Sequence, residues 1–146
     1  MIIYTIGFAQ KNAEQFFNLI RNNEIEVLID IRLNNKSQLA GFTKGNDLPF
    51  LLREICNCKY VHKSDYAPTK EILSSYQKKK IGWREYEELF LPLIENRRIE
   101  NDFEESFSMY KKVCLLCTEP MPKMCHRRLV ADYLKKRIAG ISIIHI

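Results

Sequence analysis

Two segments near the C-terminal end of the chain carry side chains that can do chemistry. Cys117 ends the apolar run 113–117, which predicts a strand buried on both faces. Cys125, His126 and Arg127 open the segment 124–138, which has helical periodicity. Helix N-termini attract anions and lower the pKa of nearby thiols, so Cys117 is a candidate nucleophile. The three residues that open the helix are candidate ligand-binding residues, with Arg127 able to form a two-pronged contact to a phosphate or carboxylate.

The same side chains are also candidates for a metal site. Zinc accepts thiolates and imidazoles, so Cys117, Cys125 and His126 together with a carboxylate would form a tetrahedral ligand set. Cys114 does not belong to this set, because residues 114 and 117 of a strand point to opposite faces of a sheet. A purely structural role for the two cysteines is a third interpretation. Our first interpretation contains no metal, and the sequence assigns no cofactor.

Polar residues also stand at the ends of other predicted strands. They are Thr5 and Gly7 after the first strand, Asp30 and Arg32 after the second, His62 after the third and Glu119 after Cys117. In an open parallel sheet, ligands bind beyond the carboxyl ends of the strands, so these positions lie along one rim. We expect Glu119 or Asp30 to act beside Cys117 as a general base or as an orienting group, and Thr5, Gly7 and Arg32 to contact the ligand.

The elements that would position these residues alternate along the chain. Strands are predicted over 2–6, 25–32, 59–62, 113–117 and 141–146, and helices over 12–23, 47–56, 69–79, 83–97, 103–111 and 124–138. Residues 33–46 read as a long loop, and Pro92 is expected to kink or break its helix. The pattern predicts an α/β fold in which helices cover both faces of a mainly parallel sheet of about five strands, as a three-layer sandwich. We expect residues 1–146 to form a single domain.

Composition narrows the function classes. The chain has 146 residues, of which 46% are hydrophobic, which is typical of a folded globular protein. It has no apolar stretch of about 20 residues and no basic, apolar leader, so we expect a cytoplasmic protein without membrane contact. Five cysteines is an odd number, and in the cytoplasm we expect them to be reduced.

The net charge of +5 favours an anionic partner, either a small molecule or a nucleic acid. A nucleic-acid-binding module without catalysis is therefore an alternative function. Its phosphate contacts would come from Arg32, Lys36, Lys44, Arg127 and Arg128. No recognised nucleic-acid motif accompanies these residues, and nothing in the sequence indicates an oligomeric state.

Several motifs give the chain a resemblance to a known family. They are Tyr4-Thr-Ile-Gly7, Leu28-Ile-Asp-Ile-Arg32, Tyr60-Val-His62, Leu115-Leu-Cys-Thr-Glu119, Cys125-His-Arg127 and Ile144-His-Ile146. On these residues the chain resembles the bacterial and archaeal family called domain of unknown function four-eight-eight. The family usually has His-Ser where this chain has Phe8-Ala9, Glu-Leu-Gly-Gly where it has Ser64–Ala67, and alanine at the position of Thr118. The resemblance implies a fold and the location of a site, and it implies no particular reaction.

Overall fold

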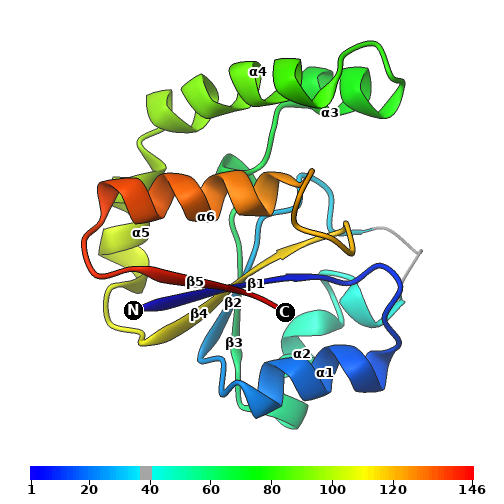
Figure 1. The fold of residues 1–146 in the computed structure, drawn as a ribbon. Helices are drawn as coiled ribbons and strands as arrows, with labels where there is room; N and C mark the ends of the chain where they lie inside the picture. The colour runs from blue at the N-terminus through cyan, green and yellow to red at the C-terminus, as the bar shows by residue number, and fades with distance from the viewer. Residues whose placement is uncertain (37–40) are drawn as a thin grey trace.

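The predicted strands form one parallel sheet. The computed structural model describes residues 1–36 and 41–146 (Figure 1). Within these residues the strands are β1 (Ile2–Gly7), β2 (Val27–Asp30), β3 (Lys59–His62), β4 (Lys112–Cys117) and β5 (Ser142–His145). Their order is β3-β2-β4-β1-β5, and every neighbouring pair is parallel. The predicted five-stranded sheet is confirmed. It was predicted to be mainly parallel, and all of its strand pairs are parallel.

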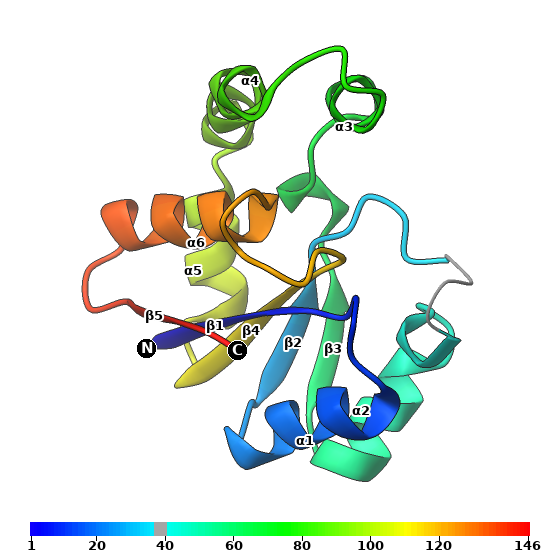
Figure 2. The ribbon, with the colours of Figure 1, turned by 45° about the vertical axis from the view of Figure 1, so that its right-hand side comes forward.

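Helices cover both faces of this sheet. One face carries α1 (Ala13–Asn22) and α2 (Leu48–Cys56), and the other carries α5 (Ile99–Phe107) and α6 (His126–Arg137). The remaining two helices, α3 (Lys70–Gln77) and α4 (Trp83–Asn96), lie as a pair on the outer side of α6 (Figures 1 and 2). This arrangement confirms the three-layer α/β sandwich. None of the helices in the described part of the chain combines the length and the apolar character that a membrane span requires.

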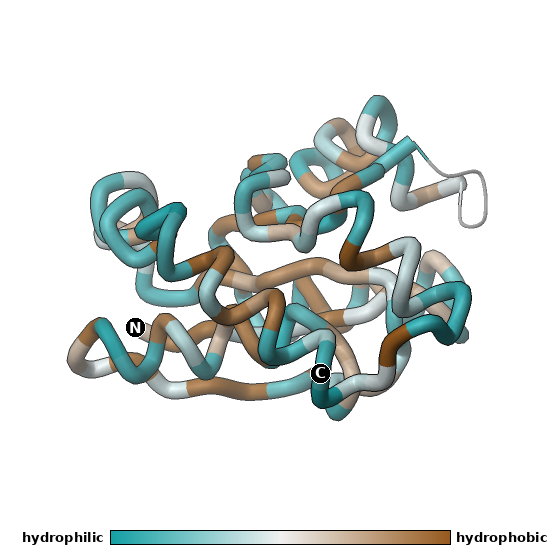
Figure 3. The backbone as a smooth tube through the Cα atoms, turned by 90° about the horizontal axis from the view of Figure 1, so that it is seen from above, coloured by the Kyte–Doolittle hydropathy of each residue, from teal (hydrophilic) through white to brown (hydrophobic). Residues whose placement is uncertain are grey.

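Alternation along the central strand β4 divides the core into two parts. Val113 and Leu115 pack with side chains from α4, α5 and α6, whereas Cys114 and Leu116 pack with side chains from α1 and α2. Figure 3 shows apolar colour running through the strands, between helices that are largely hydrophilic outside. Cys114 is fully buried. Because side chains alternate along β4, Cys114 points to the opposite face of the sheet from Cys117, as the spacing of a strand predicts.

Local signals explain most of the helix boundaries. The predicted cap Asn12 accepts a hydrogen bond from the backbone N–H of Gln15 at 2.8 Å, and the Gln15 side chain accepts one from the N–H of Asn12 at 3.0 Å. This reciprocal pair is a capping box. Pro92 was expected to kink or break its helix, but α4 continues through it without a break. Pro92 is exposed, so the carbonyl that lacks its backbone partner can bond to water.

The largest differences from the predicted bounds concern one helix and one strand. The helix expected over 103–111 is α5, which begins at Ile99 after Arg98 takes a left-handed backbone conformation with φ of 49°. The strand expected over 25–32 is β2, which is shorter than predicted because the chain leaves the sheet after Asp30. The predicted loop 33–46 contains a short 3-10 helix at Gly41–Thr43, and its residues 37–40 lie outside the described part of the chain.

Candidate active site

A pocket of about 790 Å³ opens at the carboxyl ends of the strands. Its floor consists of Phe8 after β1, residues 32–34 after β2, residues 117–119 after β4, and residues 124–126 at the start of α6. Its outer wall comes from the α3–α4 hairpin, which contributes side chains between residues 73 and 86. This is the place where ligands bind in open α/β sheets, and the volume is typical of a small-molecule site.

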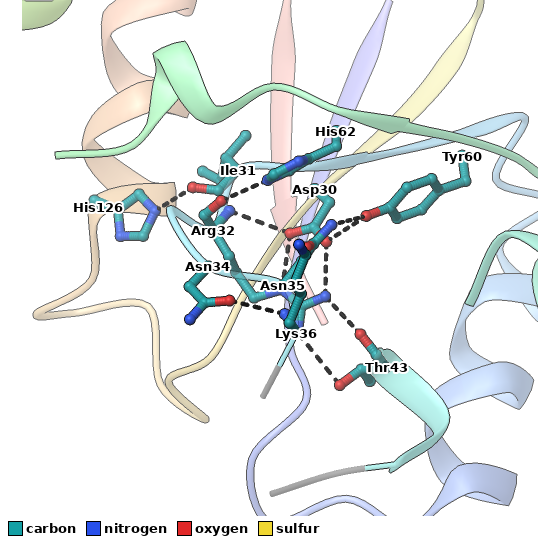
Figure 4. Close-up of polar contacts among 10 residues, drawn as sticks. All are labelled: Asp30, Ile31, Arg32, Asn34, Asn35, Lys36, Thr43, Tyr60, His62 and His126. Carbon is teal, nitrogen blue, oxygen red and sulfur yellow. Dashed lines mark hydrogen bonds and ion pairs between the residues drawn. The ribbon is translucent and has the colours of Figure 1, made fainter. Parts of the chain in front are cut away.

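Three reactive side chains meet in the floor of this pocket. The Sγ of Cys117 lies 3.5 Å from Nδ1 of His126, and the ligand atoms of Cys117, Cys125 and His126 all lie within 4.8 Å of one another. The other ring nitrogen of His126, Nε2, lies 2.9 Å from the backbone oxygen of Ile31 (Figure 4). A carbonyl can only accept, so Nε2 carries a proton, and Nδ1 is the ring nitrogen that can exchange a proton with Cys117.

The surroundings of Cys117 favour its thiolate. Burial alone would raise its pKa, but hydrogen bonds and charge outweigh burial and lower the pKa below the usual value. The donors are the Cys125 thiol and the backbone N–H groups of Thr118 and Glu119, and the charge is that of Arg127. The Cys125 pKa is raised because its thiol donates to Cys117 and is itself buried. Of the two thiols, Cys117 is therefore the one that loses its proton first.

The other cysteines have no such environment. Burial raises the pKa of Cys56, raises that of Cys58 to about 12, and raises that of Cys114 well above the usual value. All five cysteines lie within the described residues, and Cys117 is the one whose pKa is lowered. Thiol reactivity in this chain is thus predicted to concentrate at the pocket floor.

Arg127 lies behind the pocket floor. It is fully buried, and its guanidinium donates to the backbone oxygen of Glu119, to that of Pro120 at 3.2 Å, and to the Sγ of Cys125 at 3.7 Å. Its Nε has no hydrogen-bond partner among the described residues, and none of the ion pairs found there includes it. Arginine keeps its charge in proteins, so the nearby sulfur anion is the natural compensation for this buried cation.

Asp30 and Arg32 form a second buried unit beside the pocket (Figure 4). Arg32 donates from Nε to Oδ1 of Asp30 at 2.8 Å and from Nη2 to Oδ2 at 2.6 Å, which is a bidentate ion pair. The Tyr60 hydroxyl donates to the same Oδ2 at 2.7 Å, and the Thr43 backbone oxygen accepts from Arg32 at 2.6 Å. Arg32 also lies over the ring of Phe8, 5.2 Å from its centroid. Both charges are therefore fully engaged by protein groups.

The pocket lining contains some of the predicted site residues and not others. Those it brings together are Arg32, Cys117, Glu119, Cys125 and His126. Those outside the lining are Thr5, Gly7, Asp30 and Arg127. Thr5 lies 2.7 Å from Nδ1 of His145, and Gly7 packs directly against the carbonyl of Glu119. His62 is exposed, and its Nε2 lies 2.8 Å from the backbone oxygen of Arg32.

The residues proposed for phosphate contacts do not form one exposed basic surface. Arg32 and Arg127 are buried, and Arg128 is engaged in ion pairs with Glu87 at 2.8 Å and Asp132 at 3.2 Å. Lys36 is exposed and Lys44 is half-buried. The geometry therefore gives the nucleic-acid alternative no specific support.

Sequence reasoning missed the outer wall of the pocket. Trp83 and Tyr86 stack at 4.9 Å with an angle of 16° between their rings, and Tyr76 lies edge-on to Trp83 at 5.7 Å. Exposed Lys79 and Lys80 complete this wall. The spacing of the aromatic residues along α4 is equally typical of a helix face that packs in the core. A run of lysines, such as the one after α3, is typical of the exposed end of a helix. The sequence did offer one signal: the aromatic residues and the lysine run stand on either side of the same short turn, so they could have been expected to lie close together.

Comparison with known proteins supports the resemblance noted in the sequence. The sequence model of the family described as Domain of unknown function DUF488 matches residues 12–134. A search of curated proteins and a search of solved structures each found no match. The matched range includes β2, β3, β4 and most of α6, and thus the floor of the pocket apart from Phe8. The chain therefore belongs to the family Domain of unknown function DUF488.

Proposed function

We propose that this chain is an enzyme that binds an anionic, ring-bearing small molecule such as a nucleotide in the pocket and uses Cys117 as its nucleophile. The observation that carries the proposal is the position of Cys117, whose Sγ lies in the pocket floor 3.5 Å from Nδ1 of His126. A thiol beside an imidazole that a third group orients is the arrangement of an activated nucleophile. Here the orienting group is the Ile31 carbonyl.

The general base in this proposal is His126. Its Nδ1 is the acceptor closest to Cys117 and can take the thiol proton. Asp30, which the sequence favoured for this role, has both carboxylate oxygens occupied by Arg32 and Tyr60 and does not line the pocket. We therefore assign Asp30 to structural support. Glu119 is exposed and lines the pocket, which suits it to proton transfer on the substrate side.

The lining supports a ligand that combines a planar ring with negative charge. It contains the aromatic side chains Phe8, Tyr76, Trp83 and Tyr86. Arg32 is neutralised by Asp30, so the charges that can meet a ligand are those of Lys79, Lys80 and Glu119, which leave a small excess of positive charge. Aromatic faces stack on planar rings, and ammonium groups bind phosphates as point charges. Reactive thiols stay reduced in the cytoplasm, and we propose that compartment for the protein.

Alkylation by iodoacetamide tests the nucleophile. At pH 7 an ordinary cysteine is only a few per cent thiolate, so we expect Cys117 to react about tenfold faster than a cysteine in an unstructured peptide. Because the pKa of Cys117 is lowered, its rate should reach half its maximum at a lower pH than the rate of the peptide thiol does. Peptide mapping by mass spectrometry identifies the modified residue, and AMP should slow the reaction more than inorganic phosphate does.

Two variants make the alkylation result decisive. Cys117→Ser should abolish the fast phase, whereas Cys56→Ser should leave it unchanged, because the Cys56 thiol lies outside the pocket and bonds to the Phe17 carbonyl. The profile is measured on protein shown by elemental analysis to be free of zinc. A Cys117 that reacts no faster than the peptide thiol, in a folded protein, contradicts the assignment of the nucleophile. Equal rates with and without AMP contradict the ligand class.

A zinc centre is the second candidate function, and one observation favours it. Ligands at about 2.3 Å and 2.0 Å from a tetrahedral ion lie about 3.5 Å apart, and the Cys117 Sγ and His126 Nδ1 are separated by 3.5 Å. The bond from Nε2 to a backbone carbonyl is also typical of histidines that bind metals. Cys117, Cys125 and His126 would leave the fourth position open to the pocket, as catalytic zinc sites do. Elemental analysis of protein purified without added metal should find one zinc per chain, and its absence eliminates this candidate.

A further inference from the structure

Cys117 and Cys125 are close enough to react with each other. Their sulfur atoms lie within 4.8 Å, and the Cys125 thiol donates a hydrogen bond to Cys117. A disulfide requires the sulfurs to approach to about 2.05 Å, which here is a movement of a few ångströms at most. Both cysteines line the pocket, so a small oxidant that enters it meets both sulfurs.

The chain between the two cysteines is suited to this movement. Cys125 stands at the N-cap of α6 with an extended backbone, φ −140° and ψ 139°, and the Arg128 N–H donates to its carbonyl at 3.1 Å, so it lies at the edge of the helix rather than within it. Residues 118–124 form an irregular surface segment in which Glu119, Met121, Lys123 and Met124 are exposed. Such segments adjust at lower cost than helices or strands.

The other three cysteines provide internal controls. Cys58 and Cys114 are buried among the side chains that pack against α1 and α2. Cys56 is half-buried, and its thiol contacts the Phe17 backbone oxygen at 3.5 Å. None of these three lines the pocket, so oxidation through the pocket should spare them.

We propose that a small hydroperoxide entering the pocket converts Cys117 and Cys125 into a reversible disulfide, which switches the site off. This inference rests on the proposed function, because it uses Cys117 as the reactive thiol. The Cys117 thiolate attacks one peroxide oxygen, the O–O bond breaks, and the leaving alkoxide or hydroxide takes up a proton. Cys117 is then a sulfenic acid. The Cys125 sulfur attacks the Cys117 sulfur, the S–O bond breaks, and the hydroxide that leaves takes the Cys125 proton and departs as water.

The electron balance closes with the named reactants. The two sulfurs together lose two electrons, and the peroxide is reduced to an alcohol or water. A dithiol reductant returns two electrons and two protons and restores both thiols. In the disulfide Cys117 has no free sulfur to attack a substrate, and His126 has no thiol to deprotonate. Cys125 thereby protects the nucleophile from the irreversible sulfinic and sulfonic acids.

Peptide mapping under non-reducing conditions tests the proposal. The reduced full chain is treated with hydrogen peroxide, its remaining thiols are blocked with N-ethylmaleimide, and the digest is analysed by mass spectrometry. We expect a peptide linked through Cys117 and Cys125, the loss of two of the five free thiols, and full recovery of both by dithiothreitol. Cys56→Ser should give the same linked peptide. A link that involves Cys56, Cys58 or Cys114 instead overturns the proposal.

A second variant separates this proposal from the proposed function. In Cys125→Ser, peroxide should leave Cys117 as a sulfenic acid that dimedone traps and that then proceeds to sulfinic acid. If unmodified protein also stops at sulfenic or sulfinic acid, with no link to Cys125 while iodoacetamide still reacts rapidly with Cys117, the disulfide is refuted and the nucleophile stands. If Cys117 reacts quickly with neither peroxide nor iodoacetamide, both proposals fail.

Discussion

Replacing Asp30 by asparagine is expected to lower the free energy of unfolding by about 3–5 kcal/mol. Asp30 is fully buried and Arg32 is only 4% exposed, so the variant would leave a buried guanidinium without its counter-charge. The new amide would also turn an NH₂ group toward donors of Arg32 or Tyr60 that now bond to carboxylate oxygens. A loss of this size is a large part of the total stability of a domain, about 5–15 kcal/mol. Urea denaturation followed by circular dichroism measures it.

The same substitution in an exposed ion pair provides the control. Asp132 lies 3.2 Å from Arg128, and its side chain is 43% exposed. We expect Asp132→Asn to lower stability by less than about 1 kcal/mol, because water already solvates both charges. The double variant Asp30→Leu with Arg32→Met should be more stable than Asp30→Asn alone, since it leaves no unpaired charge. An Asp30→Asn loss no larger than that of Asp132→Asn contradicts the central role of the buried pair.

Replacing Gly7 by alanine is expected to damage both the stability and the reactive site. A Cβ at this position would lie 1.6 Å from the Glu119 carbonyl oxygen and 2.7 Å from Nη1 of Arg127. The nearest neighbour is backbone, so the segment after β4 would have to move. That movement disrupts the bond from Arg127 to Glu119 and displaces the backbone N–H groups that donate to Cys117. We expect a stability loss of at least about 3 kcal/mol.

The reactivity of the Cys117 thiol measures the effect of Gly7→Ala on the reactive site. With those N–H groups displaced, the pKa of Cys117 should rise, and the half-maximal pH for its alkylation should rise with it. Gly41→Ala is the matched control, because no atom of the described residues lies within 4 Å of the added carbon, and its effect should be below about 1 kcal/mol. A Gly7→Ala protein with unchanged stability and an unchanged alkylation profile would show that the close packing is not needed.

The sequence was sufficient to predict the sheet and the closeness of Cys117, Cys125 and His126, because both depend on short-range periodicity. Alternation over 113–117 separates Cys114 from Cys117, and the strand-to-helix junction brings Cys117 close to Cys125 and His126. These features follow from the regular spacing of side chains along strands and along helices, which is the same in all proteins. The structure bears out the predicted sheet and the clustering of these side chains.

The partners of Asp30 and the base that we propose for Cys117 were beyond the sequence. Arg32 is two residues from Asp30, but the carbonyl that completes its contacts comes from Thr43, at the far end of a long loop. The choice of His126 over Asp30 depends on the rotation of α6 about its axis, which aims Nε2 at the Ile31 carbonyl. Loop paths and helix rotation are set by tertiary packing rather than by local propensity.

The placement of the α3–α4 hairpin separates two properties of the pocket. The thiol and its hydrogen-bond donors belong to the sheet and to α6, whereas the aromatic and lysine wall belongs to a pair of helices on the outer side of α6 (Figure 2). Residues in the turn between these helices can therefore vary in length and composition without repacking the strands. For the enzyme that we propose, exchanging the turn residues 78–82 between relatives is therefore expected to change ligand choice, while Tyr86, Phe90 and Ile94 of α4 keep their places in the core.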